Sequence, residues 1–217
     1  AAAGTYTTGL PWQPGRAWRY TQSLHGNCAL DFATPRCNAP DTVYPAESGT
    51  VVWAYETCML VRRPGSTLEI GYQHIAPGDI DNWSAGDWVD MNNPIGTTTL
   101  VPGCNGSSSG HHVHFWMKDS EGCATNGSTL GGWTLDNPRL VKGNEVRTPS
   151  TACSGANNWV YYEYPDHTPP HTTLNLNDAP SGWPEWFNAP VRVHLHADDQ
   201  NGSGVKEIHY QLDSGSW

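Results

Sequence analysis

The sequence predicts an all-β protein built mainly from antiparallel sheet. Among its 217 residues are 23 Gly and 17 Pro, a content that favours tight turns and leaves little room for long helices. The chain is also rich in Trp and Tyr, with 11 and 9 residues. Segments such as Ser48–Tyr55 (SGTVVWAY) combine β-branched and aromatic residues in the way that is typical of strands.

The expected strands follow one another closely through residues 1–163, which we predict to form one domain. Residues 1–24 should form a loop and then a short strand. Further strands are expected at 48–55, 58–63, 67–75, 112–118 and 158–164, with short strands or turns at 86–89 and 94–96. Val101–Gly110 (VPGCNGSSSG) has the composition of a loop, and it leads into the 112–118 strand.

A Pro-rich linker is predicted at 164–172 (YPDHTPPHT), because three Pro residues within nine cannot lie inside a sheet. Residues 173–217 contain two predicted strands, at 191–197 and 205–212, with a turn at 198–204 between them. This segment is too short for a stable sandwich. We therefore expect an incomplete Ig-like β segment at the C-terminus, with a compact strand appendage packed on the first domain as the alternative.

Six Cys residues without a CxxC pair favour disulfides over a Cys-based zinc site, which places the protein outside a reducing cytosol. Six Cys allow fifteen pairings, and free buried thiols remain an alternative. Loop closure by near neighbours favours the pairs Cys28–Cys37, Cys58–Cys104 and Cys123–Cys153.

Charge and hydropathy exclude several kinds of partner. The formal net charge of −10 disfavours binding to nucleic acid or to an anionic membrane. The sequence has no apolar run of about 18 residues, so no transmembrane segment is predicted. The first residues, Ala1–Gly4, do not resemble a signal peptide, so we expect the processed form of a secreted protein. We expect this protein to be monomeric and to lie in the extracellular space or the cell envelope.

His112 and His114 are two residues apart in a predicted strand, so their side chains should share one face, with Cα atoms ~6.6 Å apart. Two such imidazoles can occupy one site, whereas His111 should face away. A second pair of this kind, His194 and His196, alternates with apolar residues, which should occupy the buried face of the predicted strand. We therefore expect that pair to face solvent and to be structural.

His25 and Asp31 would lie ~20 Å apart in an extended strand, too far for one ion. They can share a site only if the chain turns back at Gly26-Asn27, two residue types that are favoured in turns. An Asp among apolar residues is costly to bury unless it is paired or binds a metal. His74 lies near the end of the 67–75 strand, where Tyr72 is expected to share its face.

The order of these motifs resembles that of the lysostaphin-type (LytM-like, β-lytic) zinc metallopeptidases, over roughly residues 10–118. The matching segments, in chain order, are H25GNCALDFATP, S48GTVVWA, Y72QHI, G86DWVD, N93PIG and S107SSGHHVHF. The chain departs from the usual pattern in two places. It has five rather than three residues between His25 and Asp31, and His111 stands where Pro usually precedes the His-x-His pair.

The resemblance implies a compact antiparallel sheet with its site in a groove on one face. It also implies that His25, Asp31 and His114 bind one zinc ion, and that His74 and His112 are catalytic. Tyr72 and Trp116 are candidate substrate-binding residues, and Trp83 and Trp88 are further aromatic candidates for the groove.

The function predicted from this resemblance is a secreted zinc endopeptidase. It would hydrolyse peptide bonds of bacterial peptidoglycan with a zinc-activated water. There is no HExxH glutamate, so an imidazole has to act as the base. Two alternatives remain open: a catalytically silent wall-binding or regulatory module, and a peptidase that acts on ordinary or glycine-rich proteins.

Overall fold

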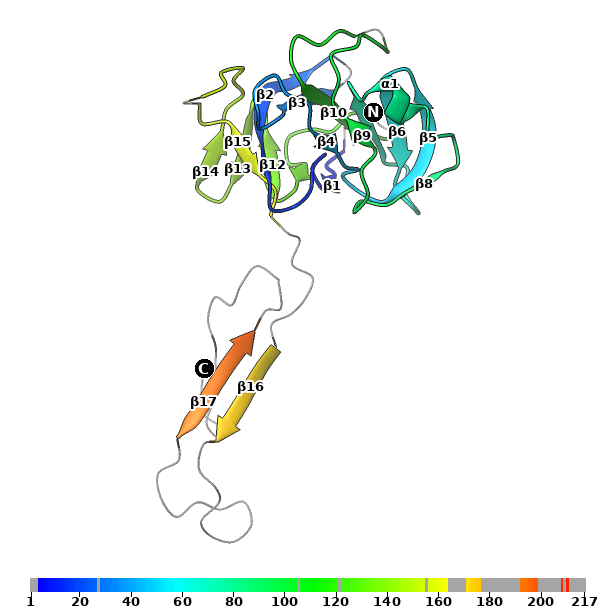
Figure 1. Cartoon of the computed structure of the whole chain (residues 1–217). Coiled ribbons are helices and arrows are strands. Elements are labelled where there is room, and N and C mark those ends of the chain that lie inside the picture. Colours follow the sequence, from blue (N-terminus) through cyan, green and yellow to red (C-terminus); the bar gives the residue numbers. More distant parts are fainter. Residues whose placement is uncertain are drawn as a thin grey trace. The chain divides into compact units, whose positions relative to one another are not determined.

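A computed structural model of the chain (Figure 1) divides into two compact units, Ala1–Glu163 and Tyr164–Trp217, which are described separately below. The structure describes residues 4–26, 28–104, 106–120, 122–154, 156–163, 171–176, 192–198, 208 and 210. Within these residues, no helix has the length and apolar character needed to cross a lipid bilayer.

The first unit is built on a sheet of eight strands whose neighbours all pair antiparallel, as the sequence predicted. In spatial order the strands are β15 (Trp159–Tyr161), β2 (Ala17–His25), β3 (Ala29–Ala33), β10 (His112–Lys118), β7 (Glu69–Gln73), β6 (Cys58–Arg62), β5 (Gly49–Tyr55) and β8 (Trp88–Val89). The predicted meander is present as β5, β6 and β7, three neighbouring strands in chain order.

Smaller elements complete this unit. A second sheet has the order β1 (Thr7–Thr8), β11 (Thr129–Leu130), β12 (Trp133–Asp136), β13 (Arg139–Lys142) and β14 (Glu145–Arg147). A two-stranded ribbon joins β4 (Thr42–Val43) to β9 (Gly96–Thr97), and α1 (Pro77–Ile80) is a single helical turn. The sequence analysis did not identify the strands between residues 119 and 157.

One face of the large sheet is buried in the core. On β10, the side chains of Val113, Phe115 and Met117 are buried, whereas those that alternate with them are half-buried. The same core cluster includes Trp133 and Leu140 from the smaller sheet. The smaller sheet therefore covers this face, and the opposite face of the large sheet is left to carry polar side chains.

Strand register arranges the side chains of this opposite face in rows, because directly paired residues project from the same face of a sheet. One continuous row crosses six strands and consists of Gln22, Asp31, His114, Gln73, Cys58 and Tyr55. The next row consists of His25, Ala29, Trp116, Gly71, Leu60 and Trp53. We call the face that carries these two rows the site face.

All six Cys residues form disulfides, and two of the three predicted pairs are wrong. The structure pairs Cys28 with Cys123, Cys37 with Cys153, and Cys58 with Cys104, so only the last pair was predicted. The expectation favoured near neighbours in sequence, whereas the two missed bridges span 95 and 116 residues. Cys28 precedes β3 and Cys123 follows β10, and the antiparallel pairing of these strands brings those ends together.

In the part of the second unit that the structure describes, β16 (His171–Leu176) pairs antiparallel with β17 (Val193–Asp198). β17 corresponds to the strand expected at 191–197, and β16 begins within the segment expected to be a linker. The strand expected at 205–212 lies outside the described residues, apart from Ile208 and Tyr210. The Ig-like character of this unit and its boundaries therefore stay predictions.

Gly71 allows a close contact on the site face that can be tested directly. A Cβ atom at Gly71 would collide with the indole ring of Trp116 on the neighbouring strand. We expect Gly71→Ala to lower the free energy of unfolding by about 1–3 kcal/mol, the usual cost of overpacking. In a Trp116→Ala background the same change should cost little, because the ring is gone. Chemical denaturation of the four proteins gives the coupling between the two positions.

The matched control is Gly78→Ala, because a Cβ there meets no atom within 4 Å. If Gly71→Ala is as mild as Gly78→Ala in the otherwise unchanged protein, the collision with Trp116 does not exist.

Candidate metal centre

The turn that His25 and Asp31 require is present. His25 ends β2 and pairs with Ala29 at the start of β3, so the chain reverses direction between these two residues. Gly26 and Cys28 both have positive φ angles, of 50° and 74°, a conformation common in tight reversals. β2 also has two register shifts before His25, and these change the direction in which the side chains of its last residues point.

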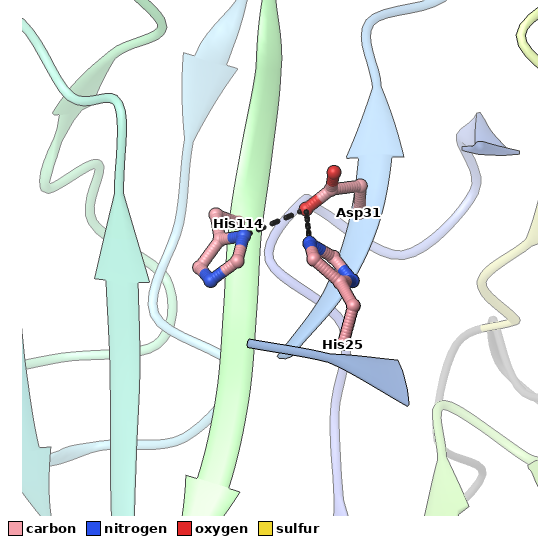
Figure 2. Close-up of side chains that lie close together, drawn as sticks. All are labelled: His25, Asp31 and His114. Atoms are coloured by element: carbon pink, nitrogen blue, oxygen red, sulfur yellow. Dashed lines mark hydrogen bonds and ion pairs between the residues drawn. The ribbon is translucent and has the colours of Figure 1, made fainter. Parts of the chain in front are cut away.

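His25, Asp31 and His114 form a compact group on the site face (Figure 2). The Asp31 Oδ1 atom lies 2.9 Å from His114 Nδ1 and 3.5 Å from His25 Nε2. One possible ligand atom from each residue lies within 4.8 Å of the others. Asp31 is only 7% exposed, so its carboxylate is shielded from bulk water while it faces the two imidazoles.

Backbone carbonyls orient two of the imidazoles. His25 Nδ1 lies 2.7 Å from the carbonyl oxygen of Ser23. A carbonyl can only accept, so His25 Nδ1 donates to it, and Nε2 is the ring nitrogen that is left facing Asp31. His112 repeats the arrangement, with Nδ1 2.8 Å from the carbonyl oxygen of Gly110 and Nε2 3.5 Å from Asp31 Oδ2.

His74 lies against His112, with ring centroids 4.6 Å apart, and 6.3 Å from the ring of His114. It is 3% exposed, and its Nδ1 atom has no hydrogen-bond partner among the described atoms. Burial, followed by the neighbouring His112 and His114, lowers the pKa of His74 to about 4. The ring is therefore neutral at physiological pH and keeps one buried nitrogen without a partner.

Tyr72 does not share the face of His74, so the prediction that it contacts substrate is wrong. Its side chain is fully buried, packs against the ring of Phe115 and accepts a hydrogen bond from the backbone N–H of Ala46. The simple alternation fails because His74 has a φ angle of 71°. That backbone conformation, just beyond the end of β7, turns the His74 ring toward the site face instead of the core.

Other histidines among the described residues make different contacts. His111 Nδ1 lies 3.1 Å from the carbonyl oxygen of Thr98, so its ring is directed at another segment. His194 and His196 lie in the second unit, are exposed, and pair with Asn175 and Thr173 across β16 and β17.

A groove of about 410 Å³ begins at His114 and continues over β7, β6 and β5. Aromatic residues lining it are Trp53, Tyr55 and Trp116, and Gln73 and Lys118 add polar groups. Trp116 thus lies where the sequence analysis placed it, beside the group. Trp53 and Tyr55 were missed. Their spacing of two residues on a predicted strand was visible, but only the register with β6 shows that they face His114.

The other two aromatic candidates do not line this groove, so that expectation is wrong for them. Trp83 packs against the core and donates from its indole nitrogen to the carbonyl oxygen of Ile95, at 3.2 Å. Trp88 is 56% exposed and lies on β8, the edge strand of the large sheet.

A second hollow, of about 210 Å³, borders the group from the β2 side. Asp31 and His112 belong to its lining. Gln22 and Thr21 come from β2, and residues 109–111 close another side. The candidate metal centre therefore lies between two hollows, one over β2 and β3 and the other over β7, β6 and β5.

Comparisons with known proteins agree with this architecture. No family model matches the chain, and no curated protein does. Among solved structures, the deep-sea M23 metalloprotease pseudoalterin matches with a TM-score of 0.56 and 21% identity, over 67% of this chain and 96% of that one. Csd3 from Helicobacter pylori matches with a TM-score of 0.39 and 16% identity, over 58% of this chain and 35% of that one. The first match shows that the chain has the fold of an M23 metalloprotease.

The low pKa of His74 predicts how stability depends on pH in metal-free protein. The pKa of His74 is lowered in the folded state, so between about pH 6.5 and pH 4 the unfolded chain binds more protons. Stability due to the neutral ring is therefore complete above pH 6.5 and is lost as the pH falls. We expect the His74→Gln protein to lose less stability than the unchanged protein over this range, as measured by urea denaturation in the presence of a chelator.

A direct check is NMR titration of the imidazole signals. A midpoint for His74 close to the ordinary histidine value would contradict the buried, neutral ring.

Proposed function

We propose that this protein is a secreted zinc-dependent endopeptidase that hydrolyses peptide bonds in bacterial peptidoglycan. The observation that carries the proposal is the group formed by His25, Asp31 and His114, whose ligand atoms lie within 4.8 Å of one another on one face of an M23-type fold. The M23 metalloprotease with the same fold supports peptidase activity in general. The peptidoglycan substrate rests on the motif order described above.

The chemistry of the donor set fits zinc. Two imidazoles and one carboxylate are the protein ligands of many catalytic zinc sites, which keep a further position open. His25 would bind through Nε2, because its Nδ1 donates to the carbonyl oxygen of Ser23. His114 would bind through Nδ1, the nitrogen that lies 2.9 Å from Asp31 Oδ1. When bound there, zinc supplies Lewis-acid chemistry for amide hydrolysis.

His112 and His74 are suited to moving protons beside the metal ligands. His112 Nδ1 donates to the carbonyl oxygen of Gly110, so Nε2 is the ring nitrogen positioned to accept a proton from water. His74 is neutral and buried beside it, with one nitrogen free to hydrogen-bond a reacting group. The aromatic groove over β5, β6 and β7 would hold one side of an extended peptide.

Secretion is supported by the three disulfides, which persist in oxidising compartments. The site of action would be the cell envelope or the extracellular space, where peptidoglycan lies.

Metal binding provides the first test. Purified protein should contain about one zinc ion per chain, and Asp31→Ala and His114→Ala should both lose it. Each removes a metal ligand, so the loss of affinity should exceed the about 10–100-fold typical of removing a residue that only orients a ligand. Zinc content by mass spectrometry of metal ions and affinity by chelator competition measure the effect.

His111→Ala is the matched control, because His111 adjoins the His-x-His pair but bonds to Thr98. If His111→Ala loses zinc and His114→Ala keeps it, the ligand set is wrong.

Activity provides the second test. We expect His112→Ala and His74→Ala to keep their zinc but to lower kcat on purified cell walls by about 10²–10⁴-fold, the usual range for loss of a general acid or base. Release of soluble fragments measures the rate, and mass spectrometry of those fragments identifies the bond that is cut.

Wild-type protein that is loaded with zinc but releases no fragments would be a silent binding module. Faster cleavage of casein or elastin than of cell walls would instead indicate a peptidase of ordinary or glycine-rich proteins.

A further inference from the structure

Arg19 is placed on the site face, next to the candidate metal centre. Its neighbours in β2, Trp18 and Tyr20, are fully buried in the core, so Arg19 projects from the opposite face. Arg19 pairs with Ala33 on β3, and Ala33 pairs with His112 on β10. These three residues form the row that adjoins the row of Asp31 and His114.

The guanidinium of Arg19 is buried without a carboxylate partner. The residue is 3% exposed, and its Nε and Nη2 atoms donate to the carbonyl oxygen of Thr34, at 3.3 Å and 3.2 Å. Its Nη1 atom donates to the carbonyl oxygen of Ala152, at 3.4 Å. These contacts fix the side chain but leave its charge uncompensated. Among the described residues, no carboxylate oxygen lies within ion-pair distance of Arg19.

Two other arginines of the first unit, Arg16 and Arg62, do have carboxylate partners. Arg16 pairs with Asp41 at 2.7 Å, and Arg62 with Glu69 at 2.6 Å. A buried cation is costly unless an anion accompanies it. Burial lowers the pKa of the Arg19 guanidinium below its ordinary value, which reflects the same cost, yet the group stays charged at neutral pH.

Arg19 forms part of the wall of the hollow that also contains Asp31 and His112. Apart from Asp31 and the imidazoles of His111 and His112, the polar side chains there are neutral and include those of Thr21, Gln22 and Asn38. Asp31 is the one carboxylate among the lining residues, and it is directed at the two histidines of the candidate metal group. The hollow thus offers one fixed positive charge and several neutral hydrogen-bonding groups beside the site of hydrolysis.

We propose that this hollow is a substrate subsite that binds a carboxylate group through Arg19, so that the enzyme prefers peptides with a free carboxylate close to the scissile bond. The proposal rests on the proposed function and specifies its substrate. A guanidinium recognises carboxylates well because its planar N–H groups match the two oxygens.

The overall charge of the protein makes this preference measurable. A chain with a net charge of −10 is repelled by anionic walls, so bulk electrostatics alone favour cleavage of walls that have lost their carboxylates. A carboxylate subsite favours the opposite. The sign of the effect therefore separates recognition at Arg19 from long-range attraction or repulsion.

The experiment compares zinc-loaded enzyme on intact cell walls and on walls whose carboxylates have been converted to carboxamides. We expect the wild-type protein to release fragments about tenfold faster from intact walls, a factor that corresponds to one charge-assisted hydrogen bond. Arg19→Gln should abolish this preference, and Arg19→Lys should keep part of it. Arg36→Gln is the matched control, because it removes an equal charge from an exposed arginine outside the hollow and should keep the full preference.

Circular dichroism and thermal unfolding establish that each variant is folded. If Arg19→Gln does not fold, the ratio of the rates at which wild-type protein releases fragments from intact and from amidated walls still tests the proposal. Equal rates, or faster release from amidated walls, would overturn the carboxylate subsite and leave the peptidase intact. Release from neither kind of wall would overturn the proposed function, and the subsite with it.

Discussion

The register of β10 against β3 and β7 decides which side chains reach the site. Pairing of His114 with Asp31 on one side and with Gln73 on the other fixes the face on which the imidazole lies. A slip of one residue would turn His114 into the core and bring Val113 to the surface. That slip is opposed by the burial of Val113, Phe115 and Met117. The hydrophobic core therefore positions the candidate ligands, although it lies on the other face of the sheet.

Much of this arrangement could be predicted from sequence because it depends on local rules. Alternation within one strand was enough to separate His112 and His114 from His111. Distance alone showed that His25 and Asp31 need a turn, and Gly26 marked its place. The same rule failed for Tyr72, which does not share the face of His74, because the positive φ angle of His74 interrupts the alternation. That angle depends on tertiary packing, which no pattern of side chains reveals.

Features that join distant segments could not be predicted in the same way. Trp53 and Arg19 belong to the site only through the order and register of eight strands, which the sequence of any one strand does not specify. The disulfides show the same limit. Cys58–Cys104 was predicted because it closes a loop of moderate length, whereas the partner of Cys28 depends on which strand lies beside β3.

The bridge from Cys28 to Cys123 has a consequence for maturation. Cys28 lies in the reversal between His25 and Asp31, so this bond tethers the hairpin tip to the segment that follows β10. The entropy cost of ordering the tip is then met during oxidative folding and not during metal uptake. If the chain binds zinc as proposed, preorganisation of this kind would make the oxidised chain the better zinc acceptor. Reduction of this bridge would then weaken metal binding without removing any of the candidate ligands.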